Sequence, residues 1–453
     1  MQNRYRTITD QQHFSRYCWT LTSVFLLFLL GILIVFGYTP TNDGEGYIEY
    51  AQIAIADGQP YPTLHHIFGK PYIWNSGIIN LVALSLWLTK SLMPLLVLLC
   101  VMKALTAWLL ARITAILFNE RTTLIALLLY ILYPNNWGQS TMLSSEIPMV
   151  FFAMLAFYII VKTTQKNNYP LDPQGRFQSE AEKELSIINY QLFTAGGFLA
   201  FANWFRPVAT IFIVAFIIYF VICKRRNWLR FSTNLIAGYL LIITIIGISC
   251  FLRTGHFLYQ ADSLWFNMAE ATYETDEQPH YNADPFPPGT ARYIDDMQHK
   301  TAIECSSIWR ERSLQWLKQH PAEYLSKIPS RLYYTYKNDI DNLVAFLPQK
   351  NNPATNNITL PLGSLRTQFS QLSAVQYFAL FCTVLYILLL LLAFGGTIRL
   401  INKRSLTVFL PLFIIVIGSL ALALFIHGET RFKAPFMPFI FMLAACFFYR
   451  RRI

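Results

Sequence analysis

Charged residues are scarce in this chain. Asp, Glu, Lys and Arg together make up 13% of its 453 residues, whereas 54% are hydrophobic. A soluble protein of this length usually divides into domains whose helices and strands are polar on one face. Here whole stretches, such as LFLLGILIVF and VLYILLLLLAF, are apolar on every face. These runs have about the length that crosses a bilayer, so the sequence predicts an all-α polytopic membrane protein.

Cysteines at the spacing of a disulfide framework or a metal centre are also lacking. Only Cys305 falls in a large water-facing segment, and no CxxC pair occurs. This pattern excludes a disulfide scaffold and a cysteine-based zinc site. The seven cysteines stand at positions 18, 100, 223, 250, 305, 382 and 446.

A signal-peptide cleavage site is absent after the first apolar run. The run is longer than an ordinary signal core, and YTPTND follows it instead of small residues. We therefore expect a retained transmembrane helix. It is the first of eleven apolar segments, at 17–37, 73–89, 92–118, 122–134, 142–161, 190–204, 206–223, 231–252, 373–398, 405–427 and 433–449.

Clusters of Lys and Arg assign the sides of the membrane, because basic residues near the ends of crossings stay mainly in the cytoplasm. Both termini then lie inside, which requires an even number of crossings. One of the eleven segments therefore does not span, and 73–89 is the segment we expect to be re-entrant or only partly inserted. The inside clusters are Arg4, Arg6 and Arg16, Lys224 to Arg226 with Arg230, Arg399 with Lys403 and Arg404, and Arg450 to Arg452.

Three regions follow from this topology. Residues 1–252 form an N-terminal membrane module with a first outer loop at 38–72, residues 253–372 a large outer loop, and residues 373–453 the last membrane helices. The large loop has 11 Lys and Arg against 13 Asp and Glu, so the +11 net charge lies elsewhere, mostly on the inner face. This distribution favours anionic lipid headgroups over nucleic acid as the partner.

Two helices are expected within the large outer loop. The stretch SSIWRERSLQWLKQHPAEYLSKIPSRLYYTY predicts a break at His320-Pro321. Pro321 then stands in the first turn of the second helix, where its missing N–H costs no hydrogen bond.

The first outer loop contains a patterned group of polar residues. Asp43, Tyr47, Ala51 and Gly58 form D-x3-Y-x3-A-x6-G. Positions 47, 51 and 54 share one face of a short helix, and a glycine commonly ends such a helix. Asp43 then lies near the helix start, where a negative charge is favourable.

Several stretches together resemble the GT-C superfamily of membrane glycosyltransferases, in the branch of protein O-mannosyltransferases and lipid A aminoarabinose transferases. Asp43 matches the acidic residue of that branch's first outer loop, although the chain has DGE where the family often has DE, with Glu45 in place of the adjacent acid. The other matching stretches are GKPYIWNSG (69–77), MLSSEIPMVFF (142–152), NWFRPVA (203–209) and HGETRFKAPFMP (427–438).

The resemblance implies a GT-C-like bundle of ten to eleven segments that transfers a sugar from a polyprenyl-phosphate donor to a lipid, glycan or protein acceptor. Asp43 would be the general base, and Glu146 the second acidic catalytic residue. Glu146, Glu45 or Glu429 would hold a divalent metal ion if one is used. The remaining substrate-binding residues implied are Glu45 and Tyr47, with Lys70, Arg206 and Arg431 stabilising the leaving phosphate.

Each of these residues also has a structural interpretation. Arg206 suits an interfacial anchor and Lys70 a snorkelling lysine, whereas Arg431 suits a partner of Glu429 and Glu146 an early-turn helix residue. For the whole chain, a transporter or flippase, an outer-face glycan polymerase or ligase, and a non-catalytic assembly protein stay open. The expected location is the bacterial inner membrane, with the site on the outer, periplasmic face.

Overall fold

The computed structural model describes residues 8–165, 179–223, 227–273, 288–346, 374–401 and 406–449. Of the residues in these ranges, 82% are helical, and no β-strand occurs among them. It is an all-α polytopic membrane protein, as the hydropathy predicts. Five helices are long and apolar enough to cross a bilayer: His13–Phe36, Met93–Leu117, Glu146–Thr164, Trp228–Thr254 and Ala374–Leu400. Shorter apolar helices are Ser76–Thr89, Pro207–Cys223 and Leu410–Phe425.

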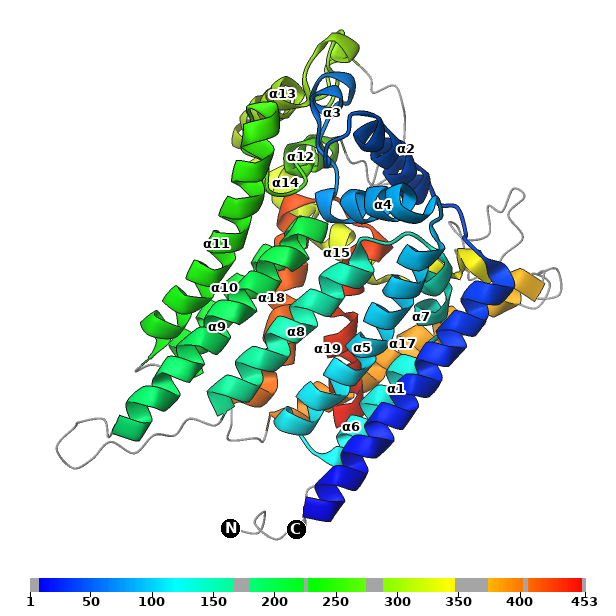
Figure 1. Ribbon diagram of the computed structural model, residues 1–453, viewed down its shortest axis with the longest axis vertical. Coiled ribbons are helices and arrows are strands. Elements are labelled where there is room, and N and C mark those ends of the chain that lie inside the picture. Colours follow the sequence, from blue (N-terminus) through cyan, green and yellow to red (C-terminus); the bar gives the residue numbers. More distant parts are fainter. Residues whose placement is uncertain are drawn as a thin grey trace.

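The helices that run along the bundle alternate in direction (Figure 1). Each of the eleven predicted apolar segments coincides with a helix. Those that run lengthwise are α1 (Ile8–Phe36), α5 (Met93–Leu117), α6 (Glu120–Ile131), α8 (Glu146–Gln165), α9 (Ser179–Phe205), α10 (Thr210–Cys223), α11 (Trp228–Thr254), α17 (Ala374–Leu400), α18 (Leu410–Phe425) and α19 (Met437–Cys446).

The eleventh segment forms α4 (Ser76–Thr89), which lies across the upper end of the bundle in Figure 1. This orientation agrees with the prediction that 73–89 does not cross the membrane. The short helices α2 (Asn42–Ala56), α3 (Leu64–Gly69), α12 (Leu264–Ala271), α13 (Ala302–Gln319), α14 (Pro321–Ser326) and α15 (Ile328–Tyr336) lie at the same end. We call it the loop end.

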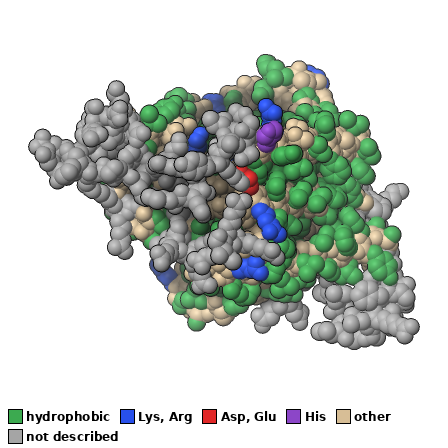
Figure 2. All heavy atoms as spheres, turned by 90° about the horizontal axis from the view of Figure 1, so that it is seen from below, with side chains coloured by type: hydrophobic (Ala, Val, Ile, Leu, Met, Phe, Trp, Pro, Cys, Tyr) green, Lys and Arg blue, Asp and Glu red, His purple; other side chains and the backbone are tan. Residues whose placement is uncertain are grey.

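The opposite end is rich in Lys and Arg, and we call it the basic end. Figure 2 looks at this end and shows basic side chains spread over it. Arg230 lies in the first turn of α11 and Arg399 in the last turn of α17, and both helix ends lie there. The predicted clusters at Arg4 and Arg6, Lys224 to Arg226, Lys403 and Arg404, and Arg450 to Arg452 fall outside the described residues.

The core of the bundle is centred on α19. All ten of its residues, Met437–Cys446, are buried. A helix that is apolar on every face is expected in the interior of a large bundle. It packs against α17, α6, α18 and α5, so the last helix of the described chain is enclosed by earlier ones.

The segment 302–336 forms three helices where two were predicted. The break before Pro321 is present, and Pro321 opens α14 as expected. A second break follows at Lys327, because Pro329 lacks an N–H and its ring clashes with the carbonyl four residues earlier. The buried Arg331 of α15 then donates to the carbonyls of Ala423 (3.0 Å) and Ala271 (3.1 Å), which fastens α15 to the membrane helix α18 and to α12 of the same outer loop.

Candidate active site at the loop end

The start of α2 presents Asp43 to the centre of the loop end. Thr41 is the N-cap residue, and its hydroxyl accepts the amide N–H of Gly44 at 3.0 Å. Such a cap satisfies one of the free N–H groups of a helix start. Asp43 lies in the first turn, where the helix dipole favours its charge. Tyr47, Ala51 and Ala54 are buried on one face, as predicted.

Gly58 has a φ of +63°, a left-handed conformation that suits a glycine just after a helix end. This agrees with its predicted role at the end of α2, whose last helical residue is Ala56.

Close packing explains the glycine that separates Asp43 from Glu45. A Cβ atom at position 44 would lie 2.8 Å from the Tyr38 hydroxyl and 2.9 Å from the Thr41 hydroxyl. Any larger residue would displace the cap. The DGE sequence is therefore a consequence of how the chain enters α2.

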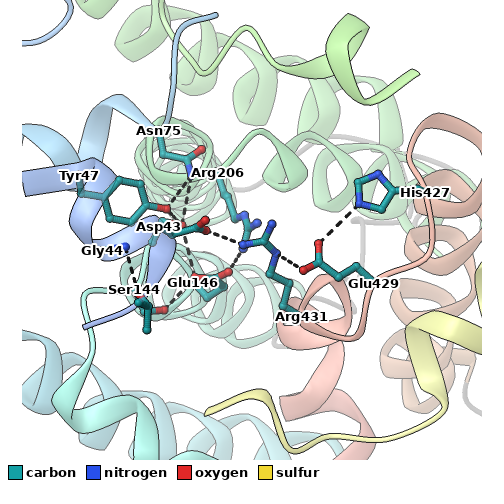
Figure 3. A network of polar contacts seen from close by, with 12 residues as sticks. Asp43, Gly44, Tyr47, Asn75, Ser144, Glu146, Arg206, His427, Glu429 and Arg431 are labelled. Atoms are coloured by element: carbon teal, nitrogen blue, oxygen red, sulfur yellow. Dashed lines mark hydrogen bonds and ion pairs between the residues drawn. The ribbon is translucent and has the colours of Figure 1, made fainter. Parts of the chain in front are cut away.

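Asp43 contacts a guanidinium from the other end of the chain. Arg431 Nη1 lies 2.5 Å from Asp43 Oδ2, and Arg431 Nε lies 2.8 Å from Glu429 Oε1. Figure 3 shows Arg431 between these two carboxylates. The Asp43 and Arg431 side chains are 37% and 38% exposed, so a ligand can reach both.

A second guanidinium lies beside the first. Pro207 favours an extended backbone at the residue before it, and Arg206 has φ −157° and ψ 130°. The chain leaves α9 at this point, and Arg206 forms an ion pair with Glu146 at the start of α8. The guanidinium carbons of Arg206 and Arg431 each lie 5.8 Å from the centre of the Phe432 ring.

We call Asp43, Glu146, Arg206, Glu429 and Arg431 the Asp43 cluster. Sequence reasoning proposed all five residues, and the structure brings them together from α2, α8, the α9–α10 junction and the segment before α19. Glu146 also accepts the hydroxyl of Ser144 at 2.8 Å. Ser144 therefore holds the Glu146 carboxylate, and this carboxylate in turn orients Arg206.

A group of neutral polar side chains supports the cluster. The Tyr47 hydroxyl donates to Ser145 at 3.3 Å, and the Asn75 amide donates to Tyr47 at 3.2 Å. Tyr47 was expected to bind substrate, but it is buried and holds α2 against α4 and α8. Sequence reasoning missed Asn75, Ser144 and Ser145, although all three lie within the quoted stretches 69–77 and 142–152.

The charge network continues into the large outer loop. His427 Nε2 lies 3.6 Å from Glu429, and His427 Nδ1 lies 3.4 Å from Glu270 of α12. Glu270 in turn pairs with Arg292 at 2.7 Å. Glu270 and Arg292 carry no sequence signal, because neither lies in a recognisable motif.

The ion pairs fix the charges of the cluster. Burial raises the pKa of Glu429, but the charge of Arg431 and the contact with His427 outweigh it and lower the pKa to about 2. Partial burial lowers the pKa of Arg431, but the carboxylates of Glu429 and Asp43 raise it above its usual value. Burial and the adjacent Arg431 lower the pKa of Arg206, which still stays protonated near neutral pH.

Glu45 and Lys70 lie outside the Asp43 cluster. Glu45 accepts the Tyr38 hydroxyl at 3.0 Å, and Lys70 pairs with Glu49 at 2.5 Å. Lys70 was expected to join the two arginines at a phosphate, but the structure places it beside Glu49. Glu45 and Glu49 are exposed on α2, and we call the side of α2 that carries them its outward side.

The carboxylates of the cluster do not fit a divalent metal ion. Hard cations are held by several oxygen ligands, of which carboxylates are the strongest. Glu146 is paired with Arg206, and Asp43 and Glu429 are both paired with Arg431. Among the described residues, no group of three or more His, Cys, Asp or Glu side chains is arranged to hold a metal. Two adjacent guanidinium groups favour an anion as the ligand.

Comparisons with protein-family models, with curated proteins and with solved structures find no match to this chain. The geometry and chemistry of the Asp43 cluster are therefore the basis for assigning a function.

Proposed function

We propose that the protein is a membrane glycosyltransferase that moves a sugar from a polyprenyl-phosphate carrier to an acceptor hydroxyl. The observation that carries this proposal is the contact between Asp43 and Arg431, with Arg206 against the same phenyl ring as Arg431. A carboxylate that can accept a proton thus lies next to two cations that can stabilise a leaving phosphate. Both groups lie at one end of an apolar bundle.

The reaction is a displacement at the anomeric carbon. The acceptor oxygen bonds to that carbon while its proton moves to the Asp43 carboxylate. The bond from the carbon to the phosphate oxygen breaks, and the carrier phosphate leaves with the electron pair. A single displacement inverts the anomeric centre.

Arg431 and Arg206 receive the charge that develops on the phosphate. Guanidinium groups bind phosphate oxygens through paired, charge-assisted hydrogen bonds. In a partly water-excluded site, each such contact stabilises the transition state by about 3 kcal/mol. In this proposal Glu146 is a positioning residue, since its carboxylate contacts Arg206.

The position of the site suits a lipid-linked donor. A polyprenyl phosphate keeps its headgroup at the membrane surface and its tail in lipid, so its reaction must occur where a bundle meets water. The basic end faces the cytoplasm by the positive-inside rule. The loop end with Asp43 therefore faces outward, which in a bacterial inner membrane is the periplasmic side.

The test is a complementation experiment in the native cell. The gene is deleted, wild type or Asp43→Asn is restored, and envelope lipids, glycans and proteins are profiled by mass spectrometry. We expect one class to lose a sugar-sized mass that wild type restores and Asp43→Asn does not. Asp57→Asn is the matched control, because Asp57 lies just after α2 and contacts Thr63 and His65 instead of the cluster.

A transporter or flippase predicts a different result. A transporter or flippase that is not coupled to protons needs no proton acceptor, so Asp43→Asn at normal membrane levels would restore the full profile. That outcome, or a deletion strain that lacks no sugar-bearing species, would refute the transferase assignment. The acceptor class is identified by the species that loses mass.

A further inference from the structure

We infer that a pocket on the outward side of α2 binds a neutral or cationic saccharide and forms the acceptor subsite of the proposed transferase. The pocket has a volume of about 700 Å³, which is within the range of small-molecule sites. The inference rests on the proposed function, since it names the acceptor of the same site. The residues that line the pocket are Asn42, Glu45, Gly46, Ile48, Glu49, Tyr50, Gln52 and Trp74.

The lining has the chemistry that recognises a sugar ring. A pyranose presents one face of C–H groups, which packs on an aromatic ring, and a rim of hydroxyl groups, which needs hydrogen-bond partners. Trp74 supplies an indole, and Asn42 and Gln52 supply amides that both donate and accept. Glu45 and Glu49 supply acceptors.

The indole of Trp74 is placed by a glycine on α2. A Cβ atom at position 46 would lie 2.3 Å from Cζ3 and 2.6 Å from Cη2 of Trp74. Only glycine lets the ring lie directly against the helix. The Trp74 ring also packs against Tyr47, with ring centres 5.6 Å apart, and Tyr50, with centres 5.2 Å apart.

The charges of the pocket set its selectivity. Glu45 and Glu49 are both exposed on the outward side of α2. Lys70 reaches Glu49 at 2.5 Å and lies 4.9 Å from the centre of the Tyr50 ring, but Lys70 is not among the lining residues. Because Glu49 is paired with Lys70, the negative charge that repels an acidic sugar is that of Glu45, whose partner is the neutral hydroxyl of Tyr38. Both carboxylates accept hydroxyl or ammonium groups.

The pocket lies beside the turn of α2 that carries the proposed base, and Asp43 itself is not among the lining residues. Asn42 and Asp43 are consecutive residues of the first turn of α2, and Gly46 is one turn further along. Trp74 contacts both Tyr50 in the pocket wall and Tyr47 on the face that also carries Asp43. A saccharide held here lies next to the turn that presents the carboxylate.

Binding without turnover tests the inference. Full-length protein in lipid nanodiscs, with no donor present, is examined by saturation-transfer NMR. The probes are methyl glycosides of the gluco, galacto and manno series, each in its neutral, amino and uronic acid form. We expect saturation transfer from the protein to neutral or amino glycosides of at least one series, and weaker saturation transfer to each matching uronic acid.

Three variants connect this binding to the pocket. Trp74→Ala should weaken it about tenfold or more, as expected for removal of an aromatic anchor, and Trp74→Phe should retain most of it. Gly46→Ala should act like Trp74→Ala, because its methyl group displaces the indole. Trp87→Ala is the matched control, since Trp87 lies on α4 with 61% of its surface exposed.

The inference fails if no glycoside of the panel receives saturation, if uronic acids bind as well as neutral sugars, or if Trp74→Ala binds like wild type. Asp43→Asn separates the two proposals, because it should bind the glycosides normally. If Asp43→Asn loses glycosyl transfer but still binds the glycosides, the result supports both the proposed function and the saccharide site. Normal activity of Asp43→Asn would refute the proposed catalytic role and leave the saccharide site standing.

Discussion

Arg431 Nη1 lies 2.5 Å from Asp43 Oδ2, although 388 residues separate the two in the chain. The same guanidinium that we assign to the leaving phosphate therefore holds the proposed base before substrate arrives. A phosphate that takes Arg431 releases the carboxylate. The donor thereby prepares the base for the acceptor, so the Asp43 carboxylate becomes free to accept a proton only when the donor phosphate is bound.

Replacement of the base separates binding from chemistry. Asp43→Asn should lower the transfer rate by about 10² to 10⁴, the range for loss of a general base. Its affinity for a polyprenyl phosphate should not fall, because Arg431 loses a competing carboxylate. Single-turnover assays and direct binding to the purified protein measure the two quantities. A parallel loss of binding and rate would argue against this competition.

The Arg206–Glu146 pair predicts a stability effect. Their side chains are only 12% and 14% exposed, so Glu146→Gln leaves a guanidinium with little water and without its direct ion-pair partner. We expect the free energy of unfolding to drop by about 3 kcal/mol. Glu146→Gln combined with Arg206→Gln should recover part of the loss. Thermal or denaturant unfolding in detergent measures the free energy of unfolding of each variant. If the losses of the two single variants simply add in the double variant, the pairing is contradicted.

The glycine at the start of α2 makes a steric prediction. Alanine favours a helix over glycine by about 1 kcal/mol, so on propensity alone Gly44→Ala should stabilise. The structure predicts the opposite, because the methyl group meets the hydroxyls of Tyr38 and Thr41. We expect lower transfer activity and a lower melting temperature. Gly31→Ala in α1 is the control, since no atom lies within 4 Å of its added Cβ.

A buried histidine makes the loop end sensitive to acid. Burial lowers the pKa of His66 to about 4, from an ordinary 6.5. The unfolded chain thus binds a proton more readily than the folded one, and stability that is complete above about pH 6.5 is lost as the pH falls toward 4. The loss over this range is about 3 kcal/mol. We expect hydrogen exchange in residues 57–70 to accelerate across it.

The control for this prediction is the adjacent histidine. His65 is 76% exposed, so His65→Gln should keep the acid sensitivity, and His66→Gln should remove it. An unchanged pH profile in His66→Gln would assign the acid response to another group.

Local patterns were sufficient to predict the bundle but only part of the site. Hydropathy is a property of short windows, so all eleven apolar segments were predicted, and the segment expected not to span is the one that lies across the loop end as α4. Asp43, Arg206 and Arg431 were predicted because they lie in recognisable stretches. The pairing of Glu270 with Arg292 and His427 was not, because it depends on how the outer loop packs. Lys70 was assigned to a phosphate from its motif alone, and only the three-dimensional placement of Glu49 shows where its charge is neutralised.

The burial of α19 has a consequence for biogenesis. At about 5 to 20 residues per second, a ribosome completes α1 roughly 20 to 80 s before it begins α19. Of the helices that surround α19, α5 and α6 are made early in this interval and α17 and α18 only shortly before α19, so the nascent bundle must admit a core helix late. Glu429 and Arg431 immediately precede that helix and arrive with it. The insertion that closes the interior therefore also brings Arg431, the cation that contacts Asp43.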